Sequence, residues 1–223
     1  MKGKTFITSC CLFALMACGT AFAQQGKIMS GPYQGPKLPM GPVEAPAAGP
    51  FFTNLGTNDA CTSCNYSTAN GFFILGPNNC FSAGATQWLA YPFISTKAGS
   101  VRQVILAITN DTAICTPTSS KFTVAIYSDA CPTAPGTQIG SAVAATAGIS
   151  PCTVATANFG HAGVTLAAGT TYWVVVTTST AASQTGTTAV WWETFSAEST
   201  VNFNDGNGWQ ASPLGGPGGF TVQ

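Results

Sequence analysis

The chain contains few charged residues and a single histidine. Only 6% of its 223 residues are Asp, Glu, Lys or Arg. Seven residues are Lys or Arg, and two of these, Lys2 and Lys4, stand at the very start of the chain. The rest of the chain therefore has five basic residues and seven acidic ones. Nucleic acids and anionic membrane surfaces are both bound by clusters of cations. The composition therefore argues against both partners.

The sequence also offers no recognisable catalytic set. A Ser-His-Asp triad needs an imidazole base, and the one histidine, His161, lies in a Gly-flanked stretch typical of a turn. A glycosidase needs two carboxylates about 5–9.5 Å apart, and Glu193 and Glu198 are better interpreted as solvated strand-end side chains. Residues 204–207 have calcium-loop character but lack further acidic ligands. We predict a protein that is not an enzyme, with no cofactor and no metal site.

No apolar run is long enough to cross a membrane comfortably, because a spanning helix needs ~20 residues. The longest run is Phe6–Ala17, which follows Lys2 and Lys4. Ala21-Phe22-Ala23 then supplies the small residues that signal peptidase accepts. We therefore predict a signal peptide over residues 1–23.

Export follows from that prediction. The mature chain would begin at Gln24, carry no transmembrane segment and be secreted, to the periplasm or the extracellular space. An alternative remains in Leu15–Gly19, a loose lipoprotein box in which Cys18 would be acylated. The downstream cleavage site fits its pattern better and favours simple secretion.

Six of the nine cysteines would remain after cleavage: Cys61, Cys64, Cys80, Cys115, Cys131 and Cys152. An even number in an exported chain indicates disulfide bonds. Zinc binding by Cys61 and Cys64 would require a second ligand pair, and a redox role would require a βαβ context, neither of which the sequence shows. We predict a Cys131–Cys152 bond, because both residues flank one predicted hairpin. The pairing of the other four stays open.

Residues 24–50 differ in composition from the rest of the chain. They contain six prolines, several glycines and few large apolar residues. Proline removes backbone donors and favours extended conformations. We predict a disordered Pro-rich arm here, with a spacer role as the alternative, and a single folded domain over residues 51–223.

That domain is predicted to be all-β, with no 3.6-residue apolar period anywhere. Lys121–Tyr127 alternates with Phe122, Val124 and Ile126 on one face, and Thr171–Thr178 is continuously apolar or β-branched, as expected of a central strand covered on both faces. Further strands are expected at 72–75, 87–94, 100–108 (Val104, Leu106 and Ile108 inward), 138–145, 154–159, 188–195, 201–204, 208–211 and 219–222. Turns are expected at Pro135-Gly136, Ala168-Gly169, Asp205-Gly206 and Asn207-Gly208. Short strands at this spacing predict a jelly-roll-like antiparallel β-sandwich.

Three segments carry a family resemblance by their shared order. They are Phe122–Asp129 with Ala134–Thr137, then Val164–Val175, and then Asn204–Trp209. In this order they resemble the bacterial choice-of-anchor extracellular domains, most closely the choice-of-anchor R type. The resemblance implies a surface or secreted β-sandwich without assigned catalysis, whose members differ in the anchor attached.

Two functions are compatible with these features. The first is an extracellular structural or adhesive module whose partner is a protein or a polysaccharide. The second is a carbohydrate-binding module that uses Trp191 or Trp192, Trp209 and the nearby Asp205, because exposed aromatic rings stack on sugars. Adjacent strand residues point to opposite faces, so Trp191 and Trp192 cannot share one core. We therefore expect one of them near a surface or under a covering loop.

Overall fold

A computed structural model describes residues 49–55, 66–130, 134–149, 153–194, 201–212 and 216–223. The predicted signal peptide and nearly all of the predicted Pro-rich arm lie outside these residues. The described part consists of strands and one four-residue helix. In it, no helix is long and apolar enough to span a membrane.

The strands follow one another closely along the chain, as the short alternating runs predict. Their bounds are β1 (Phe52–Thr53), β2 (Tyr66–Leu75), β3 (Trp88–Ile94), β4 (Gly99–Val101), β5 (Gln103–Leu106), β6 (Ile108–Asn110), β7 (Lys121–Ala130), β8 (Ala134–Thr146), β9 (Ala155–Asn158), β10 (Val164–Leu166), β11 (Thr171–Thr177), β12 (Thr188–Thr194), β13 (Val201–Asn204), β14 (Trp209–Ser212) and β15 (Phe220–Val222). The helix, α2 (Ala182–Thr185), lies between β11 and β12.

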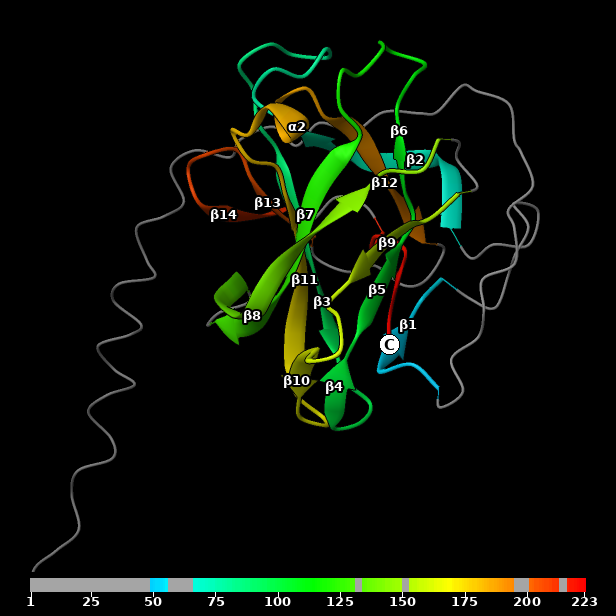
Figure 1. The fold of residues 1–223 in the computed structure, drawn as a ribbon, viewed down its shortest axis with the longest axis vertical. Coiled ribbons are helices and arrows are strands. Elements are labelled where there is room, and N and C mark those ends of the chain that lie inside the picture. The colour runs from blue at the N-terminus through cyan, green and yellow to red at the C-terminus, as the bar shows by residue number, and fades with distance from the viewer. Residues whose placement is uncertain (1–48, 56–65, 131–133, 150–152, 195–200, 213–215) are drawn as a thin grey trace, which may run out of the picture.

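The strands form two layers. One layer is a six-stranded sheet in the order β14-β13-β3-β11-β7-β8. The other contains a four-stranded sheet, β1-β15-β5-β9, and a three-stranded sheet, β2-β12-β6, while β10 and β4 form a small pair at one end. Figure 1 shows the six-stranded sheet on the left of the view and the second layer on the right. The paired strands are antiparallel, and neighbours such as β3, β11 and β7 are distant in sequence, as in jelly rolls. The predicted all-β antiparallel sandwich is confirmed.

The core lies between the two layers and is built by period-two alternation. The inward side chains predicted in β7, Phe122, Val124 and Ile126, are wholly buried in it. β11 contributes to two clusters on its opposite faces, with Val174 in the main core and Trp173 in a small cluster with Ala90 and Val175. Because β11 also has a strand on each side, the prediction of a central strand covered on both faces is confirmed.

The expected strand over 100–108 is wrong as a single element. The chain forms three strands there, and each pairs with different partners: β4 with β10, β5 with β15 and β9, and β6 with β12. The predicted direction of its side chains is nevertheless confirmed. Val104, Leu106 and Ile108 are all wholly buried in the main core.

The expected turn at Pro135-Gly136 is also wrong, because both residues belong to β8. Pro135 pairs with Asp129 of β7, and β8 lies at the edge of its sheet, where a strand tolerates a missing N–H. Gly136 allows close packing, since a Cβ there would lie 2.8 Å from the hydroxyl of Ser128. Gly136 therefore lets β8 lie close to β7 and does not mark a turn.

The other expected turns are confirmed. Gly169, between β10 and β11, has a φ of 68°. Gly206 and Gly208, between β13 and β14, have φ values of 103° and 98°, which glycine adopts most readily.

Candidate binding site

Three connections meet at one end of the sandwich, at the top of the view in Figure 1. They are the β2–β3 loop, the β6–β7 loop and the segment around α2. The first contacts the third through the Gly76 N–H, which donates to the carbonyl of Thr187 over 2.9 Å. The second contacts the third through a bridge between Ser119 and Thr187. We call this group of connections the loop end.

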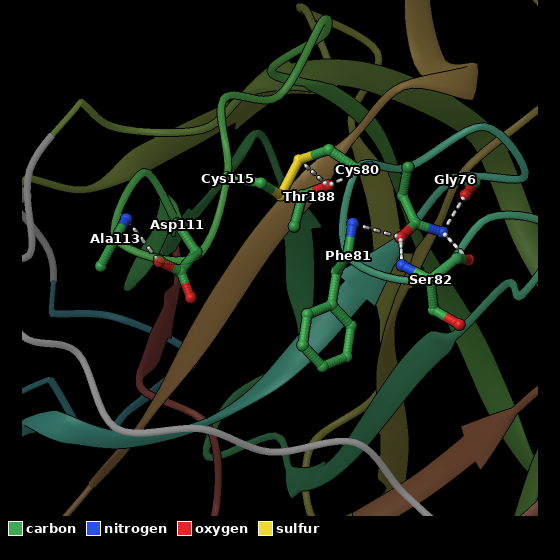
Figure 2. The surroundings of a disulfide bond; sticks show 9 residues. Gly76, Cys80, Phe81, Ser82, Asp111, Ala113, Cys115 and Thr188 are labelled. Carbon is green, nitrogen blue, oxygen red and sulfur yellow. Dashed lines mark hydrogen bonds between the residues drawn. A yellow bond between two sulfur atoms is a disulfide. The ribbon is translucent and has the colours of Figure 1, made fainter.

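A disulfide bond ties two of these connections together. Cys80, in the β2–β3 loop, is bonded to Cys115, in the β6–β7 loop, 35 residues further along the chain. Thr188, at the start of β12, supports the bond, because its hydroxyl accepts from the Cys80 N–H at 3.3 Å and lies 3.4 Å from the Cys80 Sγ (Figure 2). The bond therefore fixes the loop end to the body of the sandwich.

The β2–β3 loop is organised around one buried amide, Asn79. Its Nδ2 donates to the carbonyl of Gly76 at 2.8 Å, and its Oδ1 accepts from the N–H groups of Phe81 at 3.0 Å and Ser82 at 2.7 Å; these three partners are labelled in Figure 2. The Nδ2 also donates to the carbonyl of Ala85 at 2.7 Å. Buried polar groups that are fully hydrogen-bonded hold a loop in one conformation. The loop conformation is thus fixed by bonds within the protein and needs no bound partner.

The β6–β7 loop is held from both of its ends. Asp111 is buried, and its carboxylate accepts from the Ala113 N–H at 3.0 Å. At the other end the Ser119 hydroxyl donates to the carbonyl of Ser183 in α2, and Gly186 approaches Thr118 so closely that a Cβ would lie 1.7 Å from the Thr118 Oγ1. Only glycine fits at this contact.

An open groove of about 370 Å³ lies between the β6–β7 loop and α2. Its lining is polar and consists of Asn110, Pro117, Thr118, Ser119, Ser120, Lys121 and Ser183. Hydroxyl groups dominate it, with one amide and one ammonium group, and no aromatic side chain takes part. The Oδ1 of Asn110 is buried and accepts no hydrogen bond from any described residue. Such a lining suits a polar partner recognised through hydrogen bonds.

Neither tryptophan of the predicted sugar site in β12 is exposed, and of the two places expected for one of them, near a surface or under a cover, Trp192 occupies the second. Trp191 and Trp192 do point to opposite faces, as the alternation predicts, but both are wholly buried. Trp191 belongs to the main core, where its indole N–H donates to the carbonyl of Gly219 at 3.0 Å. Trp192 belongs to a second apolar cluster with Leu55 and Tyr66, which covers the outer face of the sheet. Neither ring can stack on a sugar.

Trp209 and Asp205 lie together at the β13–β14 hairpin, away from the groove lining. Trp209 is half-buried and packs against a cluster that includes Trp173. The carboxylate of Asp205 accepts from the backbone N–H and the side-chain amide of Asn207, both at 3.2 Å. Asp205 therefore shapes the turn between the two strands.

The predicted Cys131–Cys152 bond falls on residues outside the described part of the chain, as do Cys61 and Cys64. The observed bond, Cys80–Cys115, joins two of the cysteines whose pairing the sequence left open. No spacing rule could have selected this pair, because the two loops meet only in the folded sandwich.

Of the two carboxylates near the tryptophan pair, only Glu193 lies in the described residues. Burial raises the pKa of its carboxyl, and a hydrogen bond from the Gly216 backbone lowers it in part.

His161, the one imidazole, is exposed and lines a separate groove with Arg102 and Asn158. The described residues hold no group of three His, Cys, Asp or Glu side chains that could hold a metal ion.

The groove at the loop end is the feature that sequence reasoning missed. Its residues are scattered over 110–121 and 183, and single serines and threonines carry no signal in a chain rich in both. Comparison with known proteins adds no assignment: no family model matches the chain, and no curated protein matches it.

Proposed function

We propose that this protein is a non-catalytic extracellular module that adheres to a polymer or protein outside the cell through its loop end. One observation carries the proposal. A disulfide, a fully bonded Asn79 and the Gly186–Thr118 contact fix three connections around an open, hydroxyl-lined groove. Rigid loops on a stable scaffold are where β-sandwiches carry binding surfaces.

The chemistry of the lining supports binding over catalysis. No His, Asp or Glu lines this groove, and its one ionisable side chain is the ammonium of Lys121, with no second group to form an acid-base pair. The hydroxyls, the Asn110 amide and the Lys121 ammonium supply hydrogen bonds to a polar surface. The predicted export signal and the choice-of-anchor resemblance support an extracellular setting.

A binding screen with a groove-filling variant tests the proposal. The oxidised full chain would be applied to arrays of polysaccharides and of extracellular matrix proteins. Ser183 is exposed, so a Ser183→Trp substitution fills the groove without entering the core. We expect it to weaken the observed binding at least about tenfold, as steric blocking of a contact surface does.

The matched control is Thr165→Trp in β10, an exposed position at the far end of the sandwich (Figure 1). It should leave the affinity unchanged. Equal affinities for the wild type and the Ser183→Trp variant would show that the partner is bound elsewhere. A complete absence of binding on both arrays would contradict the adhesive function itself.

A further inference from the structure

The sequence contains the dipeptide Asn-Gly twice and the related Asp-Gly once. Asn70-Gly71 lies in β2, whereas Asp205-Gly206 and Asn207-Gly208 lie in the turn between β13 and β14 (Figure 1). In each pair the backbone nitrogen of the glycine is close to the side-chain carbonyl carbon of the residue before it, and no Cβ shields that nitrogen. The three pairs therefore share one reactive arrangement and differ in their surroundings.

The space around the glycines separates the two Asn-Gly pairs. A Cβ on Gly71 would lie 2.5 Å from the Cγ1 of Val190 and 2.7 Å from the carbonyl oxygen of Trp191, whereas a Cβ on Gly208 would meet no atom of the described residues within 4 Å. Gly71 is buried and lies opposite Trp192 in the ladder between β2 and β12, but Gly208 is exposed. Water and hydroxide therefore reach Gly208 directly, and they reach Gly71 only when β2 separates from β12.

Hydrogen bonds separate the two pairs within the turn. The Asn204 Oδ1 accepts from the Gly206 N–H at 2.9 Å and from the Gly208 N–H at 3.3 Å. The second distance is beyond the ~2.7–3.2 Å range of ordinary N–H···O bonds, so the Gly208 nitrogen is held less firmly. The Asp205 carboxylate accepts from the N–H and the Nδ2 of Asn207, both at 3.2 Å. A carboxylate is also a poorer target for a nucleophile than an amide, which leaves Asn207 as the reactive residue.

We infer that Asn207 is a site of spontaneous deamidation. Hydroxide removes the Gly208 amide proton, the Gly208 nitrogen attacks the Asn207 Cγ, and the bond between Cγ and Nδ2 breaks. The departing nitrogen takes a proton from water and leaves as ammonia, which restores the hydroxide. Water then opens the five-membered succinimide at one of its two carbonyls and gives Asp or isoAsp. Attack within the chain is favoured because the reacting groups are already side by side.

Either product alters the hairpin that contains it. Loss of the Asn207 Nδ2 removes one hydrogen bond to Asp205 and places a second carboxylate beside it, where like charges repel. IsoAsp also adds one backbone carbon to the turn, so Trp209 loses its register opposite Asn204. Trp209 packs against the cluster that contains Trp173, and we expect that packing to loosen.

Incubation of the oxidised full chain at pH 8 tests the inference. Peptide mapping by mass spectrometry detects the mass gain of amide-to-acid conversion, and fragmentation that cleaves the backbone distinguishes isoAsp from Asp. We expect Asn207 to convert at least about tenfold faster than Asn70, because Asn70 reacts only after β2 has opened.

The unfolded chain provides the control for local sequence. Each Asn-Gly pair is followed by an aromatic residue, Phe72 or Trp209. In urea the two asparagines should therefore convert at rates within about twofold of each other, since both backbones are then equally free. A tenfold difference that persisted in urea would show that the fold does not select Asn207.

Two matched variants link the chemistry to the hairpin. Asn207→Gln keeps an amide but its longer side chain does not form the five-membered ring, whereas Asn70→Gln makes the same change in β2. During incubation the NMR signal of the Trp209 indole N–H should change in the wild type and in Asn70→Gln, and it should stay constant in Asn207→Gln. A signal that changed equally in all three proteins would contradict the link.

Two further results would overturn the assignment itself. One is equal conversion of Asn70 and Asn207 in the folded protein. The other is isoAsp forming at Asp205 faster than at Asn207, because the hydrogen bonds of the turn would then not protect Asp205-Gly206.

Discussion

Glu193 is the residue whose ionisation the fold opposes. It lies in β12 where the pairing with β2 is irregular, between Trp192 and Thr194, and its charge acts on the buried Tyr91 of the core. Burial raises the pKa of its carboxyl. The hydroxyl of Tyr91, in the core, is buried without a partner among the described residues, and burial and the charge of Glu193 both raise its pKa.

The raised pKa of Glu193 makes the folded state less stable at neutral pH than at acidic pH. A carboxyl whose pKa is higher in the folded state contributes stability below its ordinary pKa and loses that contribution as the pH rises through the folded value. Glu193→Gln keeps an oxygen that can accept from Gly216 but cannot ionise. We expect the variant to have a higher Tm than the wild type at pH 7.

Thermal unfolding between pH 3 and pH 8 would measure this difference. The two proteins should converge at pH 3, where the carboxyl is neutral in both the folded and the unfolded states. A Tm gain of the same size at pH 3, or a lower Tm at pH 7, would contradict the assignment of a disfavoured charge at Glu193.

The sequence predicted the directions of the β12 side chains correctly and left their exposure open. Alternation correctly placed Trp191 and Trp192 on opposite faces. It could not reveal that the outer face of β12 is covered, because the covering cluster draws Leu55 and Tyr66 from distant parts of the chain. Direction is a local property of a strand, whereas exposure depends on tertiary packing.

At the scale of elements, the segment 99–110 shows where local pattern stops being informative. Its residues are apolar without a break from Val104 through Ile108, so the sequence predicts one strand. The partners change at Ala107, whose N–H donates to Gly219 and whose carbonyl accepts from Trp192. Those partners lie about a hundred residues away, and nothing within the segment announces them.

The contact between α2 and the β6–β7 loop yields a prediction at this scale. Gly186→Ala would place a Cβ 1.7 Å from the Thr118 Oγ1, so the loop must shift. We expect a loss of about 1–3 kcal/mol in the free energy of unfolding, as for other overpacked contacts. Chemical denaturation would measure the loss.

A double-mutant cycle provides the control. Thr118→Ala removes the clashing hydroxyl, and because Thr118 is exposed the single variant should be nearly neutral. Combined with Gly186→Ala it should restore most of the lost stability. Strictly additive losses would show that the strain arises elsewhere.

At the scale of the whole molecule, a sequence of low charge folds around a large apolar core. The sandwich buries both tryptophans of β12 and positions two polar grooves at opposite ends of the segment 102–110. The fold class followed from strand spacing alone. The grooves did not, because each is assembled from residues on separate connections that only the completed sandwich brings together.

The central claim is that the Cys80–Cys115 bond holds a binding surface in shape, and one measurement tests it most directly. It is the dissociation constant of the oxidised wild type and of the Cys80→Ser/Cys115→Ser variant for the polymer or protein captured on the array. A disulfide closing a loop of this length is worth about 3–4 kcal/mol, so the measurement is made well below the variant's unfolding midpoint. We predict at least about tenfold weaker binding by the folded variant, because its loops must be ordered on contact. Undiminished affinity in the folded variant would contradict the claim.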